Sequence, residues 1–185
     1  MGAATARLLV FQVPTVLAVA RVLVTGMSGV GKSTVLRELH RRGHLTVDTD
    51  YGGWELPDGK WDERRLARLL AEHLDLVVSG CVENQGRFYD RFEHVVLLSA
   101  PVHVLIDRVR LRTNNPYGKT VEQQDEIIYY ARTVEPRLRK GSTLELDGQR
   151  PAAELADAIE LLMTRAPSAR PGPRGGRGGR DGFAG

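Results

Sequence analysis

The segment at residues 26–33 has residue types suited to binding phosphate. It reads Gly-Met-Ser-Gly-Val-Gly-Lys-Ser and matches the pattern G-x-x-x-x-G-K-[ST] in full. Its glycines let the backbone turn tightly and point N–H groups inward, where they can surround an anion. Lys32 can place an ammonium on the β- and γ-phosphates of a nucleotide, and the Ser33 hydroxyl is a suitable Mg²⁺ ligand. The predicted nucleotide contacts in this loop are Gly26, Ser28, Gly29, Val30, Gly31, Lys32, Ser33 and Thr34.

The elements on either side of this loop support a binding role. Arg21–Thr25 (RVLVT) is a short β-branched run that predicts a buried strand, and residues 32–42 have the apolar spacing of a helix that Gly43 ends. A helix that starts directly after the loop adds the positive end of its dipole to the phosphate site. A purely structural glycine turn would not explain the lysine and the serine at the helix start.

Strands and helices alternate along the rest of the chain. Short apolar runs predict strands at residues 21–25, 45–48, 76–79, 95–99 and 143–146. Helical patterns lie at residues 32–42, 62–74, 102–112, 121–140 and 152–163. Five apolar strands separated by helices predict a three-layer α/β/α fold, in which helices cover both faces of a parallel sheet. We expect residues 21–165 to form this single domain.

Several features of other phosphate-loop proteins are absent. No Asn-Lys-x-Asp segment follows a strand, so guanine recognition of the GTPase type is unsupported. No apolar run ends in Asp-Glu, which argues against AAA-type and transporter ATPases. The chain of 185 residues is also small for those classes. These absences narrow the choice among the classes of phosphate-loop protein.

Four segments resemble the nucleoside-monophosphate-kinase-like group, and above all its shikimate-kinase-like and gluconate-kinase-like branch. They are GMSGVGKST (residues 26–34), VDTD (47–50), VVSGC (77–81) and VVLLSAPVHVLIDRVRLR (95–112). The resemblance implies a P-loop NTPase fold with the sheet order 2-3-1-4-5, in which the ends of the first three strands surround one cleft. It also implies a kinase that uses ATP and Mg²⁺ and phosphorylates a small hydroxylated molecule.

Two aspartates, Asp48 and Asp50, close the second predicted strand. Their spacing of two places both near the carboxyl end of that strand. The resemblance implies that Asp48 assists Mg²⁺ and that Asp50 orients the acceptor hydroxyl or takes its proton. The alternative is an acidic turn without a catalytic role.

Arg108 and Arg112 stand four residues apart and share a face of the predicted helix. The resemblance implies that Arg108 packs on the adenine and that Arg112 reaches the transferring phosphate, where a cation stabilises the transition state. The alternative is a solvated basic helix end, which is our interpretation of Arg110. Residues 113–120 (TNNPYGKT) have the turn chemistry of a short lid. Arg150, after the last strand, is a further candidate contact of the nucleotide.

The acceptor side departs from the shikimate-kinase pattern. Gly80 follows the third strand, but the Gly-Gly-Gly run usual there is missing. Glu83 and Asn84 offer hydrogen-bonding groups suited to a neutral hydroxylated acceptor. Trp54 and Trp61 either stack on a sugar or base or cap the core. The predicted acceptor contacts are Asp50, Gly80, Glu83 and Asn84. The arginine that grips the shikimate carboxylate has no clear counterpart, and the candidates are Arg64, Arg65 and Arg87.

Charge is distributed unevenly along the chain. The net charge is +3 and the pI is about 9.2. Residues 166–185 carry four arginines against one aspartate, a net +3, so the rest of the chain sums to about zero. The basic pI therefore gives no reason to expect a nucleic-acid-binding fold. We expect this Gly/Pro/Arg-rich tail to be disordered, with at most weak RNA or phosphate contact.

Residues 1–20 are interpreted as an N-terminal extension. Residues 8–20 are mostly apolar and end in Ala-Val-Ala, like a signal peptide, but export would separate an ATP-dependent enzyme from its ATP. No apolar run reaches the ~18 residues needed to span a bilayer. The single cysteine, Cys81, allows no internal disulfide, which favours a reducing cytoplasm. We expect a cytoplasmic monomer or homodimer without a membrane or specific nucleic-acid partner.

Two alternative functions stay open at this point. A nucleotide-dependent switch or regulatory ATPase would hydrolyse ATP without an acceptor. A nucleoside-monophosphate kinase would bind a second nucleotide, although residues 51–61 (YGGWELPDGKW) contain Lys60 as their only basic residue.

Overall fold

The computed structural model describes residues 19–164. Most of the predicted N-terminal extension (residues 1–20) and the whole predicted tail (residues 166–185) lie outside the described residues. The centre of the domain is one parallel sheet with the order β2-β3-β1-β4-β5. The strands are β1 (Arg21–Thr25), β2 (Thr46–Asp48), β3 (Leu76–Ser79), β4 (His94–Ser99) and β5 (Leu144–Asp147). The predicted direction and order of the strands are confirmed.

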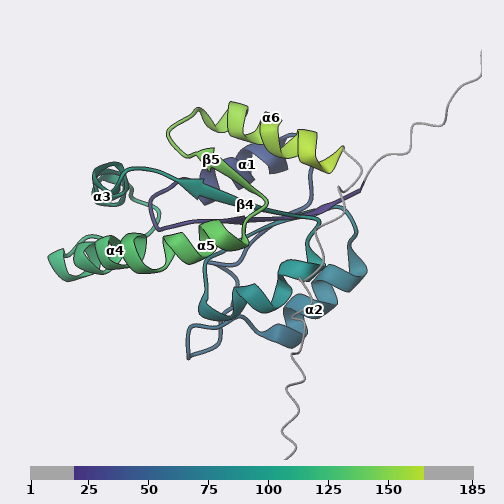
Figure 1. Cartoon of the computed structure of the whole chain (residues 1–185), viewed down its shortest axis with the longest axis horizontal. Helices are drawn as coiled ribbons and strands as arrows, with labels where there is room; N and C mark the ends of the chain where they lie inside the picture. Colours follow the sequence, from purple (N-terminus) through teal and green to yellow (C-terminus); the bar gives the residue numbers. More distant parts are fainter. Residues whose placement is uncertain (1–18, 165–185) are drawn as a thin grey trace, which may run out of the picture.

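Helices cover both faces of the sheet. They are α1 (Lys32–Arg41), α2 (Glu63–Glu72), the 3₁₀-helix η1 (Glu83–Arg91), α3 (Val102–Leu111), α4 (Val121–Thr133), α5 (Glu135–Gly141) and α6 (Ala152–Met163). Figure 1 shows α1 and α6 side by side on one face and α2 and α5 on the other. This is the predicted three-layer arrangement. In the part of the chain that the structure describes, no helix has the length and apolar character to cross a bilayer.

Alternation along β1 divides the core into two. Val22 and Val24 are fully buried in the cluster that includes Leu39 of α1. Leu23, between them in the sequence, is buried in a second cluster with Trp61. Successive side chains of a strand point to opposite faces, so a strand that is apolar at every position requires cover on both.

Two connections differ from the prediction. The helix expected at residues 121–140 is two helices, because α4 ends at Thr133 and α5 begins at Glu135. Pro136 lies in the first turn of α5, where its missing N–H is tolerated, whereas inside a longer helix it would break the hydrogen-bond pattern. The segment after β3, for which the sequence pattern predicts no helix, forms η1.

Candidate active site

The phosphate loop connects β1 to α1 at the carboxyl edge of the sheet. Gly26 and Gly29 have φ values of 144° and 88°, in the region that favours glycine. A Cβ at Gly26 would lie 2.3 Å from the carbonyl oxygen of Leu98, and one at Gly29 would lie 2.7 Å from that of Leu105. Both positions therefore require glycine for the loop to pack against β4 and α3.

The start of α1 presents N–H groups to the loop. Gly31 is the N-cap residue and supplies no side-chain acceptor, so the first-turn N–H groups are available to an anion. Lys32 is 7% exposed, and its Nζ donates to the Gly26 carbonyl oxygen across the loop at 2.9 Å. A phosphate oxygen can replace that carbonyl as the partner of the ammonium.

A cleft of about 570 Å³ lies over the loop and joins most of the predicted site. The predicted residues that line it are Ser28, Gly29, Val30, Gly31, Lys32, Ser33, Thr34, Asp50, Arg108, Arg112 and Arg150. The predicted residues that do not line it are Gly26, Asp48, Gly80, Glu83 and Asn84. Side chains from α1, from the end of α3 and from the loop before α6 thus meet Asp50 in one place.

Some residues of the cleft are absent from the sequence-based prediction of contacts. They include Arg37, Tyr51, Asn114 and Asn115. Arg37 lies one turn after Ser33 on α1, and its Nε donates to the Ser33 carbonyl oxygen at 3.3 Å. Tyr51 directly follows Asp50. Helical spacing from the phosphate loop and adjacency to an acidic strand end are the sequence signals that point to these two residues.

Arg108 ties the two walls of the cleft together. Its Nη1 donates to the carbonyl oxygen of Val30, in the phosphate loop, at 3.0 Å and to that of Gly148, after β5, at 2.9 Å. Arg150 belongs to the same loop as Gly148 but pairs with Glu154 of α6 at 3.1 Å. The charge of Arg150 is therefore already offset, whereas Arg108 contacts only neutral carbonyl groups.

Arg112 directly follows α3 and reaches the phosphate loop. Its Nη2 donates to Ser28 Oγ at 3.1 Å and to the Tyr117 carbonyl oxygen at 2.8 Å, while its buried Nε has no hydrogen-bond partner. Burial lowers the pKa of Arg112, because the charged form loses solvation. Among the described residues, Lys32, Arg108 and Arg112 form no ion pair. Three cations without carboxylate partners suit a polyanionic ligand.

The two aspartates after β2 occupy different positions. Asp48 Oδ1 accepts hydrogen bonds from Ser79 Oγ at 3.0 Å and from the Asp50 N–H at 3.3 Å. Asp50 is exposed and lines the cleft. Within residues 19–164, no three His, Cys, Asp or Glu side chains lie together as a metal set. Mg²⁺ at phosphate sites takes only one or two protein oxygens. The hydroxyl of Ser33, in the cleft, and the carboxylate of Asp48, outside its lining, are oxygens of the required type.

The predicted lid at residues 113–120 connects α3 to α4. Lys119 Nζ donates to the Arg112 carbonyl oxygen, so the segment folds back on the end of α3. Tyr117 Oη donates to Glu126 of α4 at 3.0 Å. Burial and the neighbouring Glu126 raise the pKa of Tyr117 from 10 to about 12. The lid segment thus carries the carbonyl that holds Arg112.

Three predicted acceptor contacts, Gly80, Glu83 and Asn84, do not line the cleft. Gly80 is buried, and a Cβ there would lie 2.1 Å from Thr49 Oγ1. The Asn84 amide accepts from the Trp61 N–H at 3.0 Å and donates to the Trp61 carbonyl oxygen at 3.1 Å. The Glu83 side chain is 81% exposed and does not line the cleft. Gly80 is closely packed and Asn84 is engaged in internal hydrogen bonds, whereas Glu83 faces solvent.

The two tryptophans of the predicted acceptor region pack in the second core cluster and against it. Trp61 is fully buried, and its Nε1 donates to Thr49 Oγ1 at 2.9 Å. Trp54 is partly buried, and the guanidinium of Arg65 lies 3.9 Å from its ring centre. The core-capping alternative is therefore confirmed for Trp61.

Several solved structures have this fold. The chain is similar to shikimate kinase from Acinetobacter baumannii in complex with shikimate, at 19% identity and a TM-score of 0.61, over 79% of this chain and 93% of that one. It is also similar to shikimate kinase from Bacteroides thetaiotaomicron, at 21% identity and a TM-score of 0.56, over 76% and 98%. A gluconokinase from Sinorhizobium meliloti 1021 matches at 18% identity and a TM-score of 0.50, over 80% and 92%. Identities this low show the fold alone, and they confirm the fold that the resemblance predicts.

A family described as AAA domain matches residues 22–129, from β1 into α4. No curated protein matches the chain significantly. The description of this family differs from the sequence-based expectation, which rested on the absence of an apolar run that ends in Asp-Glu; in the structure β3 and β4 end in Ser79 and Ser99. The phosphate loop, α1 and the arginines of α3 all lie within the matched residues. The chain therefore belongs to the AAA domain family.

Proposed function

We propose that this protein is an ATP- and Mg²⁺-dependent kinase that transfers phosphate to a hydroxyl group of a small metabolite. The observation that carries the proposal is that Lys32, Asp50 and Arg112 line one cleft. Phosphoryl transfer needs a cation on the transferred phosphate, a carboxylate near the acceptor hydroxyl and a second cation for the charge of the transition state. These three side chains have the types that those tasks require.

The nucleotide side of the cleft binds ATP. The phosphates lie in the loop and at the start of α1, with Lys32 on the β- and γ-phosphates. Ser33 and Asp48 would hold Mg²⁺, which would neutralise phosphate charge. Arg108 and Arg150 border the rest of the nucleotide. Because the enzyme depends on ATP, we place it in the cytoplasm.

The transfer takes place between this loop and Asp50. The acceptor hydroxyl oxygen bonds to the γ-phosphorus, the bond from that phosphorus to the β–γ bridging oxygen breaks, and ADP leaves. Asp50 takes the hydroxyl proton, and Arg112 stabilises the charge on the oxygens of the transferring group. Since Arg112 binds the Tyr117 carbonyl oxygen, a movement of the lid segment also moves this arginine.

ADP release with and without acceptors tests the proposal. The panel contains nucleoside monophosphates, sugars, polyols and aminocyclitols. We expect ADP release that depends on an acceptor, and we expect Lys32→Met to reduce it by about 10³-fold. The melting temperature should be unchanged, because Lys32 has only a carbonyl partner. Lys140→Met, at an exposed lysine of α5, is the matched control. Wild-type turnover in Lys32→Met would contradict the proposal.

An acceptor-independent ATPase is the second candidate, because the phosphate loop would bind ATP in either case. Such a protein would release ADP at the same rate whether or not an acceptor is present. It would also release one inorganic phosphate for each ADP, whereas a kinase releases none. The same assay therefore separates the two functions.

A further inference from the structure

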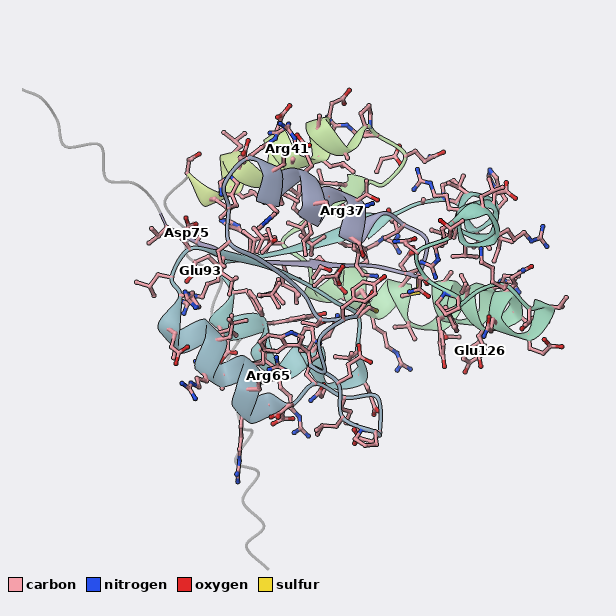
Figure 2. All side chains as sticks on the ribbon, turned by 180° about the vertical axis from the view of Figure 1, so that it is seen from behind. Arg37, Arg41, Arg65, Asp75, Glu93 and Glu126 are labelled. Carbon is pink, nitrogen blue, oxygen red and sulfur yellow. The ribbon has the colours of Figure 1, made fainter. Side chains whose placement is uncertain are left out.

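The three arginines in and directly after α1 differ in their partners. Arg41 and Arg42 both pair with Glu38, at 2.7 and 2.9 Å. Arg37 forms no ion pair with any residue in the described range 19–164. Figure 2 shows Arg37 and Arg41 at separate positions along α1, and Arg37 is the nearer of the two to the start of the helix. One arginine of this helix is therefore free to pair with an anion, on the side of the phosphate loop.

The side chain of Arg37 turns back towards the phosphate loop. Its Nε donates to the Ser33 carbonyl oxygen at 3.3 Å, and its Nη2 donates to Thr34 Oγ1 at 3.4 Å. Residues three and four apart share a face of a helix, and all three of these residues line the cleft. The guanidinium of Arg37 thus lies in the wall of the cleft, beside the first turn of α1.

The two partners of Arg37 are weak ones for a cation. Both are neutral oxygens, and both distances exceed the roughly 2.7–2.9 Å that is typical of a hydrogen bond between charged groups. The N-terminal end of a helix is positive, so it favours an anion over a second cation. The first turn of α1 has no acidic side chain, and Gly31 supplies no side-chain cap. A negatively charged ligand would therefore give Arg37 a stronger partner than the protein does.

The position of Arg37 on α1 indicates which part of a nucleotide it meets. In the proposed function, on which this inference rests, Lys32 binds the β- and γ-phosphates and Arg108 borders the nucleoside. The α-phosphate joins these two parts, so it lies between them. Arg37 stands five residues after Lys32, about 140° further round the helix, and donates to the hydroxyl of Thr34. The two cations of α1 therefore reach different phosphates.

The other arginines that border the nucleoside are more firmly held. Arg150 pairs with Glu154 at 3.1 Å. Arg108 Nη1 donates to the carbonyl oxygens of Val30 and Gly148 at 3.0 and 2.9 Å. The contacts of Arg37 are longer than these, so it is the arginine that can exchange its partners for a phosphate oxygen at the lowest cost.

We propose that Arg37 is a nucleotide-binding residue whose guanidinium contacts the α-phosphate of ATP. On binding, a phosphate oxygen replaces the neutral oxygens as its partner. The α-phosphate is present in both ATP and ADP and is not transferred, so Arg37 contributes equally to the binding of both. An interaction of this kind changes the affinity for the nucleotide and leaves the rate of phosphate transfer unaltered. Lys32 and Arg112 differ from it, because they contact the group that moves.

Calorimetry of ATP and ADP binding tests the proposal without an acceptor. We expect both nucleotides to bind about tenfold more weakly to Arg37→Met than to the wild type, because a charge-assisted hydrogen bond is lost. Arg41→Met removes an equal charge from the same helix and should leave both affinities within about twofold of the wild type. With an acceptor and saturating ATP, the single-turnover rate of Arg37→Met should equal that of the wild type.

The two diastereomers of ATP that carry sulfur on the α-phosphate locate the contact. Sulfur replaces one or the other non-bridging oxygen and accepts hydrogen bonds more weakly than oxygen does. The wild type should bind the two isomers with different affinities, and Arg37→Met should bring their ratio towards one. Unaltered nucleotide affinity in Arg37→Met, an equal loss in Arg41→Met, or the same isomer ratio in Arg37→Met and the wild type would overturn the inference. ADP release that is independent of any acceptor would instead contradict the proposed kinase, and calorimetry would still test Arg37.

Discussion

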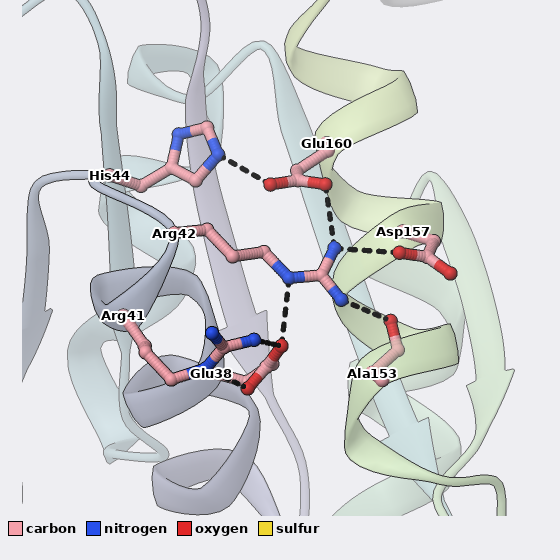
Figure 3. A network of polar contacts seen from close by, with 7 residues as sticks. All are labelled: Glu38, Arg41, Arg42, His44, Ala153, Asp157 and Glu160. Carbon is pink, nitrogen blue, oxygen red and sulfur yellow. Dashed lines mark hydrogen bonds and ion pairs between the residues drawn. The ribbon is translucent and has the colours of Figure 1, made fainter.

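Helix α1 has charged groups at both ends, and the two ends use them in opposite ways. At its C-terminal end, Arg42 Nε donates to Glu38 at 2.9 Å, and Arg42 Nη1 donates to Asp157 and Glu160 of α6 at 2.6 and 2.7 Å (Figure 3). His44 contacts the same Glu160 at 2.8 Å. We name these five residues the Arg42 cluster. Each carboxylate of the cluster accepts a hydrogen bond from Arg42, and the cluster ties α1 to α6.

Near the N-terminal end of α1, the cations have no carboxylate partner among the described residues. Lys32 binds one carbonyl oxygen, and Arg112 binds a hydroxyl and a carbonyl while its Nε has no partner. Partly buried cations without counter-ions reduce stability and are typical of sites where a ligand brings the anion. The charges near the two ends of α1, with Arg112 contributed by the end of α3, thus differ: one set holds the fold, and the other has the character of a phosphate site. Substitutions at the two ends should have opposite effects on activity and stability.

The largest expected effect is that of Arg112→Met on turnover. We expect kcat to fall by about 10³-fold, because the change removes the cation that stabilises the transferring phosphate. The melting temperature should stay the same or rise, because a desolvated charge is removed. Steady-state kinetics and thermal unfolding measure the two effects.

Arg110→Met is the matched control for Arg112→Met. Arg110 lies on the same helix but donates to Gln124 of α4, at 2.7 Å from Nη2. It should change kcat by no more than about twofold. If Arg112→Met lowers the melting temperature and leaves kcat intact, the proposed difference between the two ends of α1 is wrong.

Arg42→Met should lower the melting temperature and leave turnover intact, which is the reverse of the effect expected for Arg112→Met. Removing the guanidinium leaves Glu38, Asp157 and Glu160 without their shared partner, so we expect the melting temperature to fall by about 5 °C. Turnover should stay within about twofold of the wild type. The control is Arg68→Met, whose partner Glu72 lies on the same exposed face of α2, and it should have almost no effect. A loss of turnover in Arg42→Met at temperatures where it is folded would contradict this assignment.

The smallest expected effect is a pH dependence within the Arg42 cluster. Hydrogen bonds from Arg41 and then Arg42 lower the pKa of Glu38 from 4.5 to about 2. Glu38 thus binds fewer protons in the folded state, so its contribution to stability is complete above pH 4.5 and is lost as the pH falls towards 2. The melting temperature of Glu38→Gln should lie about 2 °C below the wild type at neutral pH. This difference in melting temperature should disappear as the pH falls from 4.5 towards 2. A difference that stays constant with pH would contradict the stabilising role of the Glu38 carboxylate.

The nucleotide side could be predicted from the sequence because its determinants are local. The glycines, Lys32 and Ser33 lie within eight consecutive residues between a strand and a helix. Arg108 and Arg112 share a helix face through their spacing alone. The strand order followed from the resemblance, and the alternation of apolar strands with helices supported it.

The acceptor side could not be predicted in the same way. Gly80 and Asn84 are residue types that suit a binding wall, but Trp61, distant in the sequence, packs against the first and occupies the amide of the second. Pro136 is a local signal for the break between α4 and α5 that the helical periodicity outweighed.

The most direct test of the account follows the γ-phosphate itself. Phosphorus NMR of wild-type protein with ATP, Mg²⁺ and the acceptor that gives the fastest ADP release resolves the fate of that group. The account predicts that the γ-phosphate signal of ATP is replaced by that of a phosphomonoester on the acceptor, and that Lys32→Met and Arg112→Met slow the exchange while Arg42→Met does not. Appearance of inorganic phosphate alone, at a rate independent of the acceptor, would contradict it.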